Sequence, residues 1–356
     1  GIATTCLTET IGDDVKRLLF EYRQEFMQDG GPLLVQVSTP SYSGTHMEGF
    51  HAAVRAVVEQ LTKESAPNGT VNILPGFLSA ADLRSLKEIA CDCGLIATVL
   101  PDFSETLDGP ALRDYPLIPE GGTKIKDIQA MSGAKATVEF GYTLPDQLSG
   151  GVHLEKTYKV PLHRLGMPVG IRETDRFFEV LSELSGKPVP EKYSMARGRL
   201  VDSLVDGHKY VFGKRAVVYG EEDLVIGLTS FLAEIGVQPV LCASGGTSGS
   251  FVKAIENAVT GFPVEMPRVH EGMDFHEIGE LAAELKPDFF LGHSKGYPLA
   301  RDLNIPLIRM GFPIHDRVGG QRLLHIGYHG AQQLFDLIVN AMVMAKQDSS
   351  EVGYSY

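Results

Sequence analysis

The chain has 356 residues and a formal net charge of −13; 43% of its residues are hydrophobic and 22% are charged. This length accommodates two or three ordinary domains, and the composition is that of a globular protein. So acidic a chain would repel nucleic acid, and no apolar run is long enough to span a bilayer. We therefore expect neither a nucleic-acid-binding nor a membrane protein.

The four cysteines, at positions 6, 91, 93 and 242, are too few and too scattered for a disulfide scaffold. This favours a reducing, cytoplasmic location. The first five residues have neither the basic start nor the apolar core of a signal peptide. Ile2 and Ala3 have the character of a buried strand end, and a strand needs neighbours. We therefore expect native residues upstream of Gly1 that complete a first domain.

Short apolar strands alternate with amphipathic helices along the whole chain. In the first third, strands are predicted to end at Cys6 and to cover residues 33–37, 71–74 and 95–100. A turn over residues 39–44 precedes a helix whose apolar positions extend from Phe50 to Leu61. A second helix is predicted over residues 80–93, and a long loop over 101–122. Loops of that length are usually functional or interfacial.

The remaining predicted elements continue the alternation. Helices are expected over residues 175–184, 191–212 and 331–345, and around the apolar stripe from Leu224 to Ile235. The long helix over 191–212 is predicted to present Val201, Leu204, Val205 and His208 on one face, and the last helix is expected to be buried. Strands are predicted over residues 216–219, 240–242, 289–292 and 306–309.

This alternation predicts an α/β fold of tandem Rossmann-like domains, with parallel sheets flanked by helices. The predicted domains are residues 1–66, the C-terminal part of an incomplete first domain; residues 67–170; and residues 171–356, with a long linking helix and a C-terminal helix. Sites in such folds lie at the carboxyl ends of strands. The candidate loops follow Thr5, Thr39, Leu74, Tyr219, Cys242, Gly292 and Met310.

Cys6, at a predicted strand end, could ligate a metal or cluster or attack an electrophile. A small buried side chain is the alternative that the residue type alone favours. Cys91 and Cys93 are about 200° apart on a helix, so their thiols point to opposite sides and both are predicted to be structural. The glycine-rich turn after Cys242 could bind an anion, but a flexible turn is favoured. None of the 11 histidines stands out as a ligand.

Three groups of residues carry a more specific signal. The first combines residues 3–14 (ATTCLTETIGDD) with 39–46 (TPSYSGTH). The second combines 197–202 (RGRLVD), 206–210 (DGHKY) and 213–215 (GKR). The third combines 306–317 (PLIRMGFPIHDR) with 327–330 (GYHG). Together, in this order, they resemble the nitrogenase component 1 family, and its β-type subunits in particular.

Two β-type groups resemble the chain: the catalytic β subunit of the molybdenum–iron protein, and NifN, its relative in the cofactor-assembly scaffold. Residues 316–322 (DRVGGQR) look like NifN, because the catalytic subunit typically has a His-rich stretch there, and the chain ends soon after its last helix. The NifN resemblance, which we favour, implies a heterotetramer with the α-type subunit NifE. It also implies transient binding of an iron–molybdenum cofactor precursor and contact with the nitrogenase iron protein. Such a chain has no turnover by itself.

The resemblance also implies an iron–sulfur cluster, [4Fe–4S] or P-cluster type, at the interface with the α-type partner. Cys6 matches the β-subunit position that ligates the P-cluster, whose other β-chain ligands would lie upstream of Gly1. The isolated chain is therefore expected to hold no stable cluster. In α-type subunits a His before the Gly-Tyr-x-Gly segment holds the cofactor, but Ile326 stands there, so no catalytic or cofactor ligand is assigned. A receptor for a small molecule or metal chelate is the alternative of another class.

Overall fold

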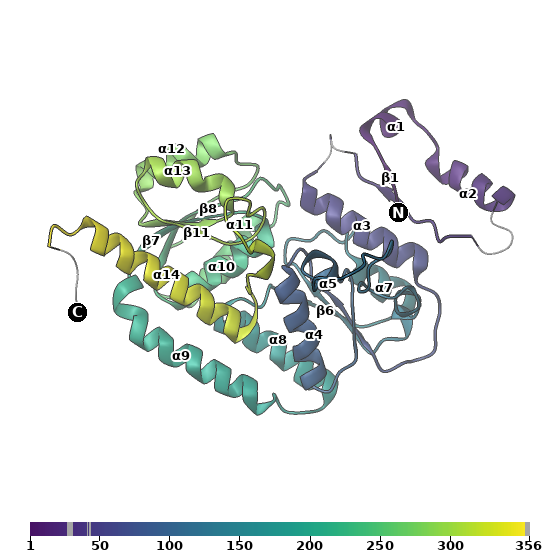
Figure 1. Cartoon of the computed structure of the whole chain (residues 1–356), viewed down its shortest axis with the longest axis horizontal. Coiled ribbons are helices and arrows are strands. Elements are labelled where there is room, and N and C mark those ends of the chain that lie inside the picture. Colours follow the sequence, from purple (N-terminus) through teal and green to yellow (C-terminus); the bar gives the residue numbers. More distant parts are fainter. Residues whose placement is uncertain (27–30, 41, 43, 353–356) are drawn as a thin grey trace.

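The computed structural model describes residues 1–26, 31–40, 42 and 44–352. Within these residues, three parallel sheets follow one another along the chain (Figure 1). The first contains β1 (Ile2–Thr4) and β2 (Gln36–Ser38). The second has the order β4-β3-β5-β6, and the third has the order β11-β10-β7-β8-β9. The predicted α/β class with parallel sheets is confirmed.

The two larger sheets each contain a strand at which the order reverses. In the second sheet this strand is β3, between β4 and β5, and in the third it is β7, between β10 and β8. Crevices for ligands form at the carboxyl side of such positions. The strands of these sheets are β3 (Val71–Leu74), β4 (Ala97–Val99), β5 (Ala136–Phe140), β6 (Leu162–Leu165), β7 (Arg215–Tyr219), β8 (Gln238–Ala243), β9 (Arg268–His270), β10 (Phe289–Gly292) and β11 (Leu307–Arg309).

Helices connect successive strands, and the two longest, α9 and α14, run side by side (Figure 1). The helices are α1 (Cys6–Ile11), α2 (Val15–Phe26), α3 (His46–Leu61), α4 (Ala80–Asp92), α5 (Ser104–Leu107), α6 (Ile125–Gln129), α7 (Gly150–Tyr158), α8 (Gly170–Ser185), α9 (Glu191–Val211), α10 (Glu222–Glu234), α11 (Phe251–Val259), α12 (Phe275–Leu285), α13 (Tyr297–Asp302) and α14 (Gly327–Ser349). Among the described residues, no helix is both long and apolar enough to cross a bilayer.

The start of the chain differs from the predicted strand ending at Cys6. β1 ends at Thr4, and Cys6 is the first residue of α1. The reason is local capping: Thr5 N–H donates to Thr8 Oγ1 at 2.9 Å, and the Thr5 side chain accepts from Thr8 N–H, so the helix begins directly after Thr5. The strand predicted over 33–37 is also displaced, because β1 pairs with Gln36–Ser38. Residues 41 and 43 of the predicted turn lie outside the described residues.

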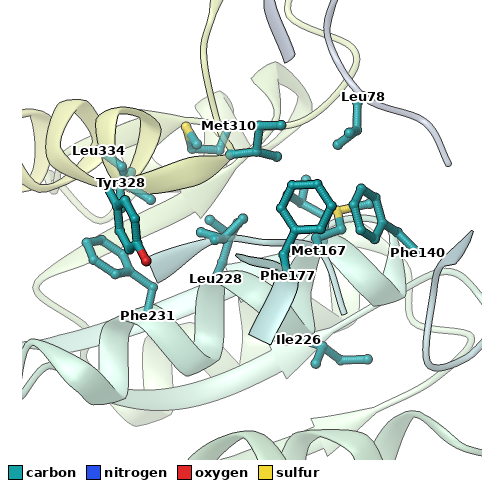
Figure 2. Packing of buried hydrophobic residues seen from close by; sticks show 14 of the residues in the cluster. Leu78, Phe140, Met167, Phe177, Ile226, Leu228, Phe231, Met310, Tyr328 and Leu334 are labelled. Atoms are coloured by element: carbon teal, nitrogen blue, oxygen red, sulfur yellow. The ribbon is translucent and has the colours of Figure 1, made fainter. Parts of the chain in front are cut away.

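The largest core cluster joins the second and third sheets. Figure 2 shows Phe140, Met167 and Phe177 facing Leu228 and other side chains of α10 and α14. Burying each such side chain contributes about 1.5–3 kcal/mol. Because this cluster is continuous between the two sheets, their relative position is set by packing. α8 begins at Gly170, earlier than the predicted residue 175, and it lies against α10 and α14.

The predicted apolar face of α9 is wrong. Val205 is 73% exposed, and Val201 and His208 are also exposed. The buried residues of α9 are Tyr193, Ala196, Leu200, Gly207 and Val211. α14 packs on that face, so contact with another helix decides which stripe is covered. α14 is itself only partly buried, because Leu337 and Met344 are exposed.

The sequence patterns did not indicate β5, β6 and β9, or helices α7, α11, α12 and α13. β5 is buried at every position even though it contains Glu139, and such a polar residue obscures a strand pattern. The second sheet lies within the predicted domain 67–170 and the third within 171–356. Val58 of α3, however, packs with Leu74 and Leu154 of the second unit. The boundary at residue 66 stays a prediction.

Candidate functional site

Cys6 lies at the first position of α1, just beyond the carboxyl end of β1. Its side chain is half-buried. The turn around it is well held: Glu9 accepts hydrogen bonds from Thr4 Oγ1 at 2.5 Å and Ser38 Oγ at 2.6 Å, and these two bonds lower the pKa of the Glu9 carboxyl. Glu9, which belongs to α1, therefore connects this helix to the ends of β1 and β2. These hydrogen bonds connect the start of α1, where the thiol lies, to the ends of both strands.

The surface around Cys6 is apolar and exposed. Leu7 is 68% exposed and Ile11 62%, and in α2 both Phe20 and Phe26 are more than half exposed. Of the residues of α2, only Leu19 is buried. Contiguous exposed apolar side chains mark an interaction surface. The thiol therefore lies next to a surface that suits a second protein chain.

The other cysteines lie elsewhere and are chemically quiet. Cys91 is exposed and Cys93 is buried, which confirms that their thiols point to opposite sides of α4. Burial raises the pKa of the Cys93 thiol to about 11 and that of Cys242 to about 12. No group of three or more His, Cys, Asp or Glu side chains in the described part of the chain is arranged to hold a metal ion. An iron–sulfur cluster at Cys6 would therefore take its remaining ligands from outside this set.

A cavity of about 440 Å³ forms a second candidate site, between the second and third sheets. It lies at the carboxyl ends of β7, β8 and β10, next to the start of α3. Its polar lining residues are Thr45, His46, Glu48, His51, Thr143, Glu221, Glu222, Asp223, Ser244, Thr247, Ser248, His293 and Lys295. The sequence-predicted loops after Tyr219, Cys242, Gly292 and Met310 all contribute to it, whereas the loop after Thr5 does not.

The glycine-rich turn after Cys242 lines this cavity and is more ordered than the flexible turn predicted. Its backbone donors are bound by acidic side chains of the same chain. Ser248 N–H donates to Glu222 Oε1 at 3.2 Å, while Gly249 N–H and Phe251 N–H donate to Glu271 Oε1 at 3.0 and 3.1 Å. The anion that this turn binds is thus an internal carboxylate.

Sequence reasoning missed the histidines of the cavity. His46, His51 and His293 come from the start of α3 and the end of β10. Burial lowers the pKa of His51 to about 4, and burial together with the nearby Lys295 lowers that of His293 to about 4, so both rings are neutral at pH 7. The signals in the sequence were that His46 and His51 flank a predicted helix start and that His293 follows a predicted strand.

His325 has a different role. Its Nδ1 lies 2.7 Å from Asp82 Oδ2, and the backbone N–H groups of His325 and Ile326 donate to Asp82 Oδ1. Burial alone would raise the pKa of Asp82, but the contacts with His325 outweigh it and hold the pKa below its usual range. The pair joins the start of α4 to the segment before α14. Ile326, which stands where α-type subunits have their cofactor histidine, is packed in the core.

The comparison with known proteins decides the family. The family described as "Nitrogenase component 1 type Oxidoreductase" matches residues 1–343. The chain belongs to the nitrogenase component 1 family. It is 34% identical over 344 residues to the nitrogenase molybdenum-iron protein beta chain of Clostridium pasteurianum, covering 96% of this chain and 75% of that one. Its identity to the nitrogenase vanadium-iron protein beta chain of Trichormus variabilis is 35%, with 96% and 75% covered.

Solved structures agree with this membership. The structure of nitrogenase Cp1 at pH 6.5 superposes with a TM-score of 0.95 at 34% identity, covering 99% of this chain and 77% of that one. A chain of nitrogenase Cp1 at pH 5 superposes with a TM-score of 0.68 at 14% identity, which shows a shared fold. The chain is therefore a β-type member of the nitrogenase component 1 family.

Two of the three groups that carry the family resemblance, the second and the third, meet in the structure. Arg197, of the second group, forms an ion pair with Asp175 through two nitrogens, with N–O distances of 2.8–3.1 Å. Tyr328, of the third group, donates to the same carboxylate at 2.6 Å. Asp175 thus connects α8, α9 and the start of α14. These family residues hold the third sheet's helices together, while Cys6 lies at the other end of the chain.

Proposed function

We propose that the chain is the β-type subunit of the catalytic component of a nitrogenase. In this proposal it assembles with an α-type partner into a heterotetramer, and Cys6 is one thiolate ligand of an iron–sulfur cluster at the interface between them. The cluster would supply one-electron storage and transfer. The chain's own contribution is to present the thiolate at a fixed position and to bury it against the partner.

The observation that carries the proposal is the setting of Cys6. A half-buried thiol stands at the end of a parallel strand, on a turn held by Glu9, and is bordered by the exposed side chains of Leu7 and Ile11. A thiol with a purely structural role would be expected in a closed apolar core, as Cys242 is. A cluster ligated partly by another chain needs the arrangement seen here, with the ligand at the edge of an uncovered apolar surface.

The names of the relatives support the catalytic alternative. Eight relatives, including the two described above, are 30–35% identical to the chain. Each is named as the beta chain of a molybdenum-iron or vanadium-iron nitrogenase protein. Cys6 also favours this alternative, because some NifN chains lack a cysteine at that position.

The test is Cys6→Ala in the chain co-expressed with its α-type partner and purified without oxygen. We expect the iron content of the complex to fall and the electron paramagnetic resonance signal of the interface cluster to be lost or changed, because one thiolate ligand is missing. Acetylene reduction with the nitrogenase iron protein should fall with it.

The matched control is Cys91→Ala, which removes an exposed thiol on α4 and should leave iron content, spectrum and activity unchanged. Circular dichroism would show that both variants are folded. A Cys6→Ala complex with the iron content and spectrum of the unmodified complex would disprove the assignment of Cys6.

The NifN-type scaffold is the second candidate, and residues 316–322 favour it. In the structure Arg309 forms an ion pair with Asp316 through two nitrogens, with N–O distances of 2.6–3.0 Å, and Arg317 and Val318 after it are exposed. As a scaffold, the chain would pair with NifE, bind the iron–molybdenum cofactor precursor transiently and dock the iron protein.

A purified complex that reduces acetylene rapidly contradicts the scaffold proposal, whereas a complex that only transfers a precursor to apo-nitrogenase contradicts the proposal of a catalytic subunit.

A further inference from the structure

The cavity between the second and third sheets has the size of a small-molecule site. Its volume of about 440 Å³ lies in the range of about 300–1,000 Å³ found for ligand pockets. None of its lining residues belongs to the segment that carries Cys6. A ligand in this cavity would therefore bind independently of the proposed interface cluster.

The acidic residues of the cavity already accept hydrogen bonds from the chain itself. Glu48 accepts from Thr45 N–H at 2.6 Å, and Glu221 accepts from Leu224 N–H at 2.9 Å. Asp223 accepts from Tyr142 N–H at 2.6 Å and from Thr143, and Glu222 accepts from Ser248. These carboxylates cap helices and hold loops, so they are poorly placed to bind a cationic ligand.

One buried nitrogen of the cavity, in contrast, lacks a partner. His293 Nδ1 is buried without a hydrogen-bond partner among the described residues. Lys295 forms no ion pair with any residue that the structure describes, and its ammonium is close enough to lower the pKa of His293. A buried polar atom without a partner is costly, and the cost is removed when a ligand supplies one. This cost applies to His293 Nδ1; the exposed ammonium of Lys295 would in addition give an anionic ligand a charge-assisted contact.

Much of the cavity wall is apolar. Its apolar lining residues include Met47, Leu144, Leu148, Met273, Phe275, Ile278 and Phe312. A free inorganic anion would leave these side chains in contact with water. A ligand with both an apolar body and one anionic group would satisfy the two parts of the lining.

We propose that this cavity binds a small amphipathic carboxylate, whose anionic group faces Lys295 and His293 and whose apolar body packs against Phe275 and Phe312. The site goes beyond the proposed function, since it uses neither Cys6 nor the partner surface. The state of Glu221 is compatible with this site: burial, reinforced by the neighbouring Asp223, raises the pKa of its carboxyl to about 8. A protonated Glu221 repels an anion less than a carboxylate would.

The proposal is tested with indole-3-propionate, which combines an aromatic body with one carboxylate, and with its neutral amide as a matched ligand. Binding to the full chain is measured by saturation-transfer NMR and calorimetry. We expect saturable binding of the acid with a Kd of about 1 mM, which is usual for a ligand of this size. The amide should bind about tenfold more weakly, because it loses the charge-assisted contact.

Lys295→Met should weaken binding of the acid about tenfold and leave binding of the amide unchanged. Lys253→Met, which changes an exposed lysine of α11 outside the cavity, should have no effect. Both positions are exposed, so both variants should fold. The proposal is overturned if neither ligand binds saturably below about 10 mM, if acid and amide bind equally, or if Lys295→Met leaves binding of the acid unchanged.

Discussion

In this chain, the surroundings of a side chain decide its chemical properties. Cys6 and Cys242 are the same residue type, yet one is half-buried at an open apolar surface and the other is enclosed with a raised thiol pKa. His51 and His276 differ in the same way, because His51 is largely buried and His276 is exposed on α12. For Cys242 and His51, burial disfavours the charged form of the side chain.

The pH dependence of stability follows from His51. Its pKa is about 4 in the folded chain, against 6.5 for an unperturbed histidine. Between these values the unfolded chain binds a proton that the folded chain does not. The contribution of neutral His51 is therefore fully present above pH 6.5 and is lost as the pH falls toward 4.

We predict that His51→Gln reduces the loss of unfolding free energy between about pH 7.5 and pH 5 by about 2 kcal/mol. Urea unfolding at the two pH values measures this difference. His276→Gln is the control and should show the same loss as the unmodified chain. If His51→Gln loses as much stability as the unmodified chain, His51 is not held neutral.

At the scale of elements, the contact between α9 and α14 depends on one glycine. A Cβ at Gly207 would lie 2.5 Å from the ring carbons Cε1 and Cζ of Phe335, which is buried. On the same helix, a Cβ at Gly198 would meet nothing within 4 Å. The two glycines therefore have different functions: Gly207 permits close helix packing, whereas Gly198 is dispensable.

We predict that Gly207→Ala lowers the free energy of unfolding by about 1–3 kcal/mol, because the added methyl group overpacks the helix contact. Gly198→Ala should instead raise it by about 0.5–1 kcal/mol, because alanine loses less backbone entropy in a helix. Chemical denaturation of both variants tests this. Equal effects of the two substitutions would show that the α9–α14 contact adapts freely.

At the scale of the whole molecule, burial is uneven. α10 is buried along nearly its whole length between other elements, whereas α1 has no buried residue and α2 has only Leu19. In Figure 1, α1 and α2 project from the rest of the chain. Segments with few buried apolar contacts open at low free energy. The segment that carries Cys6 therefore gains most from a partner.

We predict that backbone amides of α1 and α2 exchange rapidly with solvent in the isolated chain and become strongly protected in the complex with the α-type partner. Hydrogen–deuterium exchange followed by mass spectrometry measures both states. α10 serves as the internal control, with slow exchange in each. Rapid exchange of α1 and α2 in the complex would contradict a role of this surface in partner binding.

The sequence by itself determined the α/β class, several strands within a residue or two of their observed ends, and the family, whereas the role of Cys6 as a cluster ligand stays a prediction. These features depend on local pattern and on motifs, which a linear sequence contains. Only the tertiary structure decided which face of α9 is buried, that β5 tolerates Glu139, and that His46, His51 and His293 meet at one cavity. Burial and juxtaposition arise from contacts between residues far apart in the chain, and these contacts leave little trace in local periodicity.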